Sequence, residues 1–179
     1  IKRGKGAQKL MLDAHIDQIG FLVSHIEDKG WVRFVPLGGF DPRNLMARRA
    51  LVHGRQDLVG IMVYGGKPVH MQTEEERRSE LKISDFYIDL GLPKEEVGEQ
   101  VRIGDPITLQ QTTVEMGRLV TGQCMDDRLC VYIMLEALRR VQSHEVDIHA
   151  VAAVQEEVGL RGTTPAAYGI APDIGLALD

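Results

Sequence analysis

The stretch DIHAVAAVQEEVGLRGTTPAAYGIAPDIGLALD, residues 147–179, decides the fold class. Its pattern predicts a buried strand over 147–154, a helix over 163–168 and a second strand over 174–178. Upstream, RLCVYIMLEALRRV (128–141) has apolar residues at helical spacing. This alternation of strands and helices predicts an α/β fold with a mostly parallel sheet and helices packed on it.

Two adjacent acids, Glu156 and Glu157, follow the first of these strands. Each carboxylate is costly to remove from water unless it has a partner. Successive residues of an ideal strand point to opposite faces, but both side chains can reach one crevice where the chain leaves the sheet. Ligands of α/β sheets bind in that crevice, so one Glu could hold a metal ion while the other takes a proton from water. The alternative is a pair of solvated turn residues.

Three other features place a His or an acid at the end of a predicted strand or the start of a helix. AHIDQIG contains His15 and Asp17, which face the same way if the segment is extended. CMDDRLC places Asp126 and Asp127 before a helix, and the strand DIGLAL is followed by Asp179. Taken singly, these residues could be a surface His, a helix N-cap and a loop acid. Together, their types are those of a two-metal hydrolytic site, in which one of the two aspartates would bridge the metal ions and the other would support it.

The first two thirds of the chain have a different character. Residues 9–15 read as a buried strand, and residues 19–39 read as two strands around a turn at 27–30. From residue 41 to residue 118 the chain shows short strands and turns and little helix. This middle section predicts a small β domain that is inserted into the α/β domain.

The composition bounds the class of protein. The 179 residues are 44% hydrophobic and 26% charged, which is ordinary for a globular protein. The net charge of −5 argues against nucleic acid as the main partner, and no apolar run is long enough to predict a membrane span. Cys124 and Cys130 form neither a CxxC pair nor a disulfide framework, which favours the cytoplasm. Because the chain starts at Ile1 and stops directly after an apolar run, we expect it to be part of a longer protein.

The order of these motifs resembles one family. HxD, DD, EE and a strand-ending D, together with GWVRFVPLGGFDPR, FYIDLG, RIGDPIT, VTGQCMDDR and QEEVGLRG, are similar to the motifs of the TET (tetrahedral) aminopeptidases. These are dinuclear metallo-aminopeptidases of the glutamyl/leucyl type, and some members have been labelled endoglucanases. The resemblance covers nearly the whole chain. It implies a phosphorylase/hydrolase-like αβα catalytic domain, in two incomplete segments at 1–40 and 119–179, with an inserted PDZ-like β-barrel at 41–118.

The resemblance also implies the cofactors, two divalent metal ions that are Zn²⁺, Co²⁺ or Mn²⁺. The implied metal ligands are His15, Asp126, Glu157 and Asp179. Asp126 would bridge the two ions, Glu156 would be the general base, and Asp17 would support His15 as a ligand. A further His ligand is expected beyond residue 179.

The activity implied by the resemblance is removal of N-terminal residues from peptides by an activated water. Members commonly form twelve-subunit shells, so we expect a homo-oligomer. A deacylase or carboxypeptidase of the same fold, or a catalytically silent assembly subunit, are the alternatives. A glycosidase would need two carboxylates across a sugar-binding cleft. The acids here cluster as ligands instead, and the chain has four Tyr and one Trp with which to stack sugars.

Overall fold

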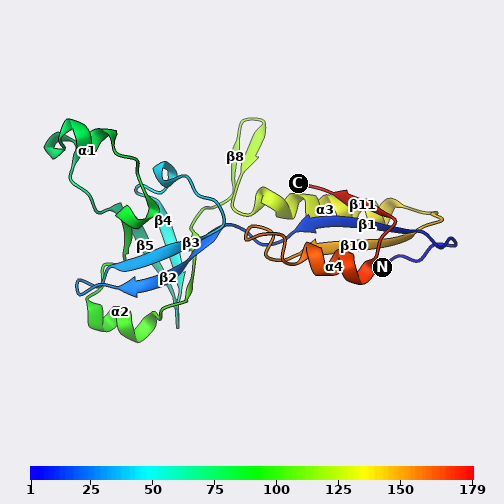
Figure 1. The fold of residues 1–179 in the computed structure, drawn as a ribbon, viewed down its shortest axis with the longest axis horizontal. Coiled ribbons are helices and arrows are strands. Elements are labelled where there is room, and N and C mark those ends of the chain that lie inside the picture. Colours follow the sequence, from blue (N-terminus) through cyan, green and yellow to red (C-terminus); the bar gives the residue numbers. More distant parts are fainter. The chain divides into compact units, whose positions relative to one another are not determined.

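The computed structural model describes residues 1–179. The chain forms two compact units, both drawn in Figure 1. The first, which we call the sheet unit, combines Ile1–Gln18 with Thr113–Asp179. The second, the barrel unit, consists of Ile19–Thr112. The chain therefore leaves the sheet unit once, builds the barrel and returns.

The sheet unit contains a three-stranded parallel sheet in the order β10-β1-β11. Its strands are β1 (Lys9–His15), β10 (Asp147–Ala153) and β11 (Ile174–Ala177). Two helices, α3 (Met125–Arg140) and α4 (Thr163–Ile170), connect to these strands in chain order. The parallel α/β fold predicted from the sequence is confirmed, and it brings the carboxyl ends of all three strands to one edge.

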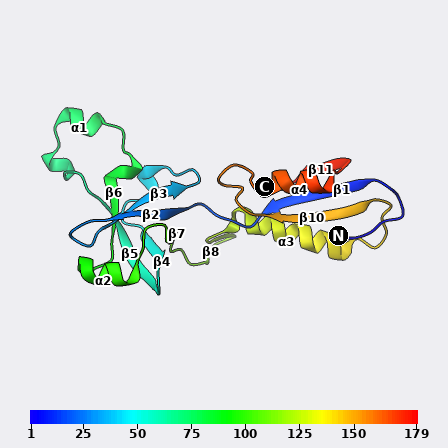
Figure 2. The same ribbon diagram turned by 60° about the horizontal axis from the view of Figure 1, so that its bottom comes forward.

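The two helices cover opposite faces of this sheet, as Figure 2 shows. On the α4 face, Lys9 Nζ donates to the carbonyl of Ile170 at the end of the helix (2.8 Å). Thr163 Oγ1, at the start of α4, donates to Asp13 Oδ2 on β1 (2.7 Å). Lys9 and Asp13 lie an even number of residues apart, so they share one face of the strand. Both contacts therefore lie on the α4 face, and α3 covers the other face of the sheet.

A glycine allows α4 to begin close to the sheet. A Cβ atom at Gly162 would lie 2.4 Å from the carbonyl oxygen of Val154, which follows β10. A side chain there would push the start of α4 away from the strand. A short hairpin of β8 (Val114–Met116) and β9 (Leu119–Thr121) leads from the barrel back toward α3.

The barrel unit is a closed sheet with strand order β2-β3-β6-β5-β4-β7. The strands are β2 (Gly20–Ile26), β3 (Val32–Leu37), β4 (Arg49–His53), β5 (Asp57–Tyr64), β6 (Phe86–Asp89) and β7 (Pro106–Leu109). Its interior is apolar and includes Phe21, Val23, Leu45, Val52, Met62, Ile88 and Ile107. Two short helices lie outside the barrel sheet, α1 (Glu74–Arg78) and α2 (Lys94–Gln100). Three 3-10 turns complete the unit, at Pro42–Asn44, Val69–Met71 and Ile83–Asp85.

The barrel begins earlier in the chain than the boundary predicted at residue 41. The hairpin predicted around residues 27–30 is present, as β2 and β3, but it belongs to the barrel. The reason is long-range pairing, because Phe21 pairs with Ile107 of β7 and Val32 pairs with Ile88 of β6. The end of the inserted unit also differs, at Thr112 instead of residue 118, because the β8–β9 hairpin groups with the sheet unit.

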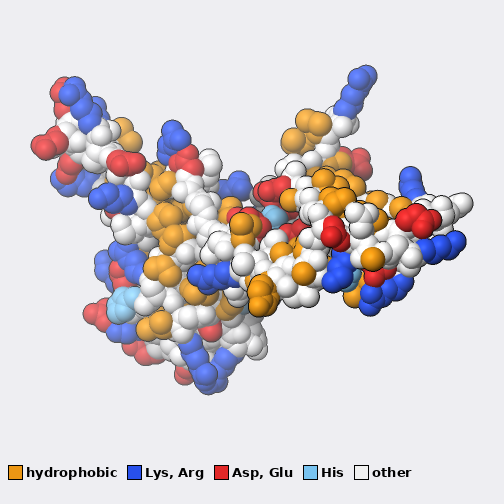
Figure 3. All heavy atoms as spheres, turned by 45° about the vertical axis from the view of Figure 1, so that its right-hand side comes forward, with side chains coloured by type: hydrophobic (Ala, Val, Ile, Leu, Met, Phe, Trp, Pro, Cys, Tyr) orange, Lys and Arg blue, Asp and Glu red, His pale blue; other side chains and the backbone are white.

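Large apolar side chains are exposed on the sheet unit, and Figure 3 shows hydrophobic side chains on one face of the molecule. Those of the sheet unit include Leu129, Tyr132, Ile133 and Leu135 of α3 and Ile174 and Leu176 of β11. None of the helices is both long enough and apolar enough to cross a bilayer.

We expect Phe21→Ala to lower the free energy of unfolding of the barrel unit by about 3–5 kcal/mol, because it leaves a cavity in the core. The Phe21 ring is fully buried, and its centroid lies 4.8 Å from that of Phe34 and 4.1 Å from that of Phe40. Urea unfolding of the 179-residue chain, followed by tryptophan fluorescence, measures this loss. The single tryptophan, Trp31, stacks on Tyr87 within the barrel and so reports on that unit.

Val59→Ala is the matched control in the same unit. Val59 lies on β5 with 51% of its surface exposed, so its truncation should change the free energy of unfolding by less than about 0.5 kcal/mol. A loss for Phe21→Ala as small as the loss for Val59→Ala would contradict the packing described here.

Candidate metal centre

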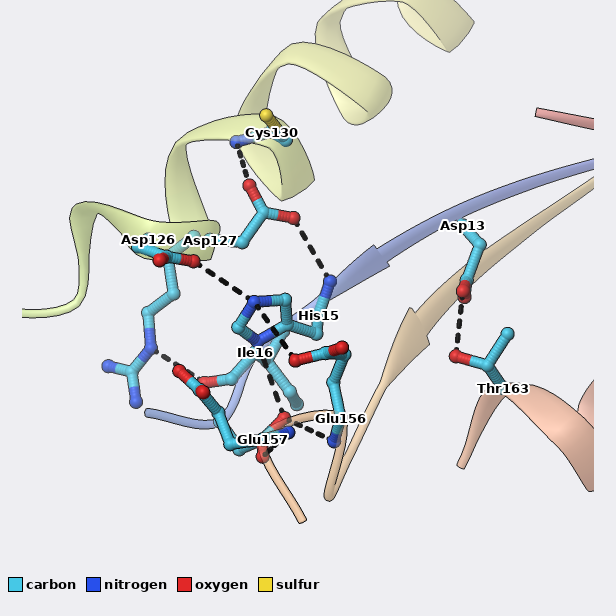
Figure 4. A network of polar contacts seen from close by, with 11 residues as sticks. Asp13, His15, Ile16, Asp126, Asp127, Cys130, Glu156, Glu157 and Thr163 are labelled. Carbon is cyan, nitrogen blue, oxygen red and sulfur yellow. Dashed lines mark hydrogen bonds and ion pairs between the residues drawn. The ribbon is translucent and has the colours of Figure 1, made fainter. Parts of the chain in front are cut away.

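The candidate site lies at the carboxyl edge of the parallel sheet, where Figure 4 shows its polar contacts. β1 ends with His15, Glu156 and Glu157 follow β10, and Asp179 follows β11. Asp126 lies in the first turn of α3. The parallel arrangement explains why residues far apart in the chain meet, because this edge is where open α/β sheets bind ligands.

His15 is the centre of the cluster, with 4% of its surface exposed. Its Nε2 atom lies 3.0 Å from Asp126 Oδ1 and 3.9 Å from Glu156 Oε2. Its Nδ1 atom lies 3.4 Å from Asp17 Oδ1 and is buried without a hydrogen bond. Burial lowers the pKa of His15, but the hydrogen bond to Asp126 and the charges of Asp17 and Glu156 outweigh it and raise the pKa above its ordinary value.

Asp17 holds the turn that carries the two glutamates. Its Oδ1 accepts the backbone N–H of Glu156 (3.1 Å) and its Oδ2 accepts the backbone N–H of Glu157 (3.3 Å). The same Oδ1 is the atom beside His15 Nδ1. One carboxylate therefore ties the end of β1 to the end of β10 and flanks the histidine ring.

The two glutamates reach the same crevice although they are adjacent in the chain. The residue before them, Gln155, has a φ of 57°, so the backbone has left the strand conformation there. Ligand atoms of His15, Glu156 and Glu157 lie within 4.8 Å of one another. Burial raises the pKa of Glu157, and the negative charge of Asp126 adds to that effect. A cation would relieve this repulsion.

The two aspartates of α3 lie in different surroundings. The Asp126 side chain is 77% exposed and contacts His15 Nε2, whereas 2% of Asp127 is exposed. Asp127 Oδ2 accepts the backbone N–H of His15 (3.1 Å), and Oδ1 accepts that of Cys130 (3.3 Å). The second bond joins a residue to the N–H three positions later, as in an N-cap. The capping alternative considered for this pair thus describes Asp127, and Asp126 faces the histidine.

A second group of close ligand atoms includes Asp179. Atoms of His15, Asp127 and Asp179 lie within 4.8 Å of one another. Asp127 therefore occupies the place in this group that the sequence led us to expect for Asp126. The contacts favour Asp126 as the more available ligand, since both oxygens of Asp127 already accept N–H groups.

The donor set fits a divalent metal ion. The donors are one imidazole nitrogen and several carboxylates, which suit Zn²⁺, Co²⁺ and Mn²⁺. A bound cation would satisfy two features of the site: a buried imidazole nitrogen without a hydrogen bond, and Glu157, whose pKa is raised by burial and by the charge of Asp126. The residues that could hold it are His15, Asp126, Glu156, Glu157 and Asp179.

The cysteines that flank the aspartates are held by hydrogen bonds. A hydrogen bond to Asp127, burial and the nearby acids raise the pKa of the Cys130 thiol to about 11. This thiol is therefore protonated at neutral pH and is no nucleophile. Cys124 Sγ donates to Gln18 Oε1 (2.8 Å), which also accepts from Gln123 Nε2 (3.0 Å).

The sequence suggested that one of the two aspartates supports the other, but it did not show that Asp127 would contact the backbone of His15. Sequence reasoning did not consider Arg128, whose Nε–H donates to the carbonyl of Ile16 (2.9 Å). The available signal was its place beside the aspartates in the triplet DDR, because a loop that carries a ligand needs neighbours to hold it.

Comparison with known proteins places this geometry in one family. The model of the M42 glutamyl aminopeptidase family matches residues 1–179. A lysyl aminopeptidase from Pyrococcus furiosus is 36% identical over 97% of this chain and 51% of its own length. The structure of an aminopeptidase from the archaeon Desulfurococcus kamchatkensis is similar with a TM-score of 0.89 and 39% identity, over 100% of this chain and 49% of that one.

A further solved structure is the TET1 peptidase of Pyrococcus horikoshii, which can assemble into a tetrahedron or a large octahedral shell. It has a TM-score of 0.84 and 30% identity, over 98% of this chain and 54% of that one. The chain spans about half the length of the curated relatives it matches. The resemblance read from the motifs and the αβα fold with its barrel are thereby confirmed. The chain belongs to the M42 glutamyl aminopeptidase family.

Proposed function

We propose that the whole protein is a metal-dependent aminopeptidase that removes N-terminal residues from peptides. The observation that carries the proposal is the convergence of His15 Nε2 with Asp126, Glu156 and Glu157 at the carboxyl edge of the sheet. Membership of the M42 family and relatives named as aminopeptidases support it. The proposal extends to a homo-oligomer in the cytoplasm, as a solved relative assembles into shells.

The residues that would hold two divalent ions are His15, Asp126, Glu157 and Asp179. When bound, such ions lower the pKa of water and polarise a carbonyl oxygen. Asp17 keeps the two glutamates in place through their backbone N–H groups. The metals would be Zn²⁺, Co²⁺ or Mn²⁺, which the nitrogen and oxygen donors accept.

Glu156 is the proposed general base. Its carboxylate is half-buried and lies 3.9 Å from His15 Nε2, within the cluster of proposed metal ligands. It would take a proton from the attacking water and pass it to the leaving amine. Its backbone N–H is held by Asp17, which limits the positions that the side chain can take.

Hydrolysis of matched aminoacyl anilides, free or acetylated at the amine, tests the activity. We expect the whole protein to cleave the free-amine set, to lose this activity on chelation and to regain it with added Zn²⁺, Co²⁺ or Mn²⁺. Cleavage of the acetylated set instead would indicate a deacylase. Two bound metals per chain without cleavage of either set would indicate a silent assembly subunit.

Glu156→Gln should lower the turnover number by about 10²–10⁴-fold, because the amide cannot accept the proton. We expect the metal content to stay at the wild-type value, since this residue is assigned to proton transfer. Turnover and metal content are to be measured on the same samples of the whole protein. Glu115→Gln, an exposed acid on β8, is the matched control and should leave both unchanged. Near-normal turnover of Glu156→Gln with full metal content would refute the assignment.

Metal binding should strengthen as the pH rises. The pKa of His15 lies above its ordinary value of 6.5 and that of Glu157 above its ordinary value of 4.5, so the metal-free protein holds protons that a metal must displace. Apparent affinity should therefore increase through pH 6.5 and above, with protons released on binding. Calorimetric titration in buffers of different ionisation enthalpy measures that release. An affinity that does not change between pH 6 and pH 8 would contradict the raised pKa of His15.

A further inference from the structure

The start of α3 forms hydrogen bonds with two neighbouring backbone groups at the end of β1. Asp127 Oδ2 accepts the N–H of His15 (3.1 Å), and Arg128 Nε–H donates to the carbonyl of Ile16 (2.9 Å). Figure 4 shows Asp127 beside the backbone of His15. Two adjacent residues of α3 thus hold the segment that carries the histidine.

The same segment is held from the other side by β10. The N–H of Ile16 donates to the carbonyl of Ala153 (2.9 Å), and Asp17 accepts the two glutamate N–H groups. The backbone next to His15 therefore has partners on both neighbouring elements. These bonds fix the backbone from which the imidazole of His15 projects.

Asp127 and Asp126 differ in how many of their carboxylate oxygens are already hydrogen-bonded. Asp127 is buried, and each of its oxygens accepts a backbone N–H, as a buried carboxylate requires. Asp126 is largely exposed and keeps one oxygen without a protein contact. Of the two adjacent aspartates, Asp126 thus contacts the histidine of the site, and Asp127 binds the backbone that supports this histidine.

Arg128 uses its guanidinium for the same backbone segment. No carboxylate lies within ion-pair distance of it, although Asp126 is two residues away. A hydrogen bond from a charged donor to a carbonyl is stronger than one between neutral groups. A cation cannot itself ligate a metal ion, so any effect of Arg128 on metal binding must act through position.

We propose that Asp127 and Arg128 are positioning residues that hold His15 for the metal ion, and that Asp127 is not itself a metal ligand. The proposal rests on the proposed function. It makes a specific demand: loss of either side chain must weaken metal binding in the same way, although one is an anion and the other a cation.

The test compares Asp127→Asn and Arg128→Met in the whole protein. In Asp127→Asn one of the two N–H groups would meet an amide NH₂, which is a donor, so one bond is lost. In Arg128→Met the bond to Ile16 is lost. We expect both variants to bind Co²⁺ with the wild-type stoichiometry at saturation but with about 10–100-fold weaker affinity. In the metal-free protein, faster amide hydrogen exchange is expected for Asp127→Asn at His15 or at Cys130, whichever loses its acceptor.

Three further variants complete the comparison. Arg128→Lys retains a donor that can reach a carbonyl and should recover part of the affinity lost in Arg128→Met. The double variant Asp127→Asn with Arg128→Met should lose less than the product of the two single effects, because both act on one segment. Arg139→Met, an exposed residue on α3 that pairs with Glu136, is the matched control and should bind Co²⁺ like the wild type.

Two results would overturn the proposal. Loss of one Co²⁺ per chain at saturation in Asp127→Asn, with wild-type binding in Arg128→Met, would make Asp127 a ligand. Wild-type affinity in both variants would show that neither residue positions the histidine. If Asp127→Asn does not fold, Arg128→Met and Arg128→Lys decide the question by affinity alone. A wild-type protein that binds no Co²⁺ would instead contradict the proposed function, on which this proposal depends.

Discussion

The parallel pairing of β1 with β10 is the constraint on which the candidate site depends. The register runs from Lys9 opposite Asp147 to His15 opposite Ala153, so the two strands end together. Glu156 and Glu157 follow three and four residues later, within reach of Asp17. A shift of one residue in this register would turn the side chains of one strand to the other face of the sheet. The site residues therefore meet only in this register of the two strands.

The site places several carboxylates close together, and each of them is costly to remove from water without a partner. Two of them, Asp17 and Asp127, each accept two backbone N–H groups, which offsets the cost of their partial or full burial. Asp126, Glu156 and Glu157 have fewer donors around them, and the pKa of Glu157 is raised. The acids thus form two groups. One is a pair with hydrogen-bond donors for both oxygens, which holds the backbone in place, and the other faces the crevice and has few donors. Only the second group gains from a cation.

The sequence predicted the fold class well, because the strands at residues 9–15 and 147–154 and the helix at 128–141 are local patterns. It placed the barrel boundary too late, since the assignment of Phe21 and Val32 depends on partners more than fifty residues away, Ile107 and Ile88. Each candidate site residue had a plausible structural alternative when taken alone. The parallel topology brings these residues together, and a pattern of local motifs does not contain it.

The aspartate pair shows where local reasoning ends. Asp126 and Asp127 are chemically identical neighbours, and the sequence offered two alternatives for the pair: a helix cap, or one metal ligand with the other aspartate as its support. In the structure the backbone at Asp126 is extended (φ −85°, ψ 111°) before the regular helix begins, and the two carboxylates have different partners. Asp127 caps the helix through Cys130 and at the same time holds the amide of His15, so capping and support of the site are one role. The bond from His15 to Asp127 joins the end of β1 to the start of α3. Because Asp126 precedes Asp127 in the chain, the same bond keeps the exposed Asp126 beside the histidine.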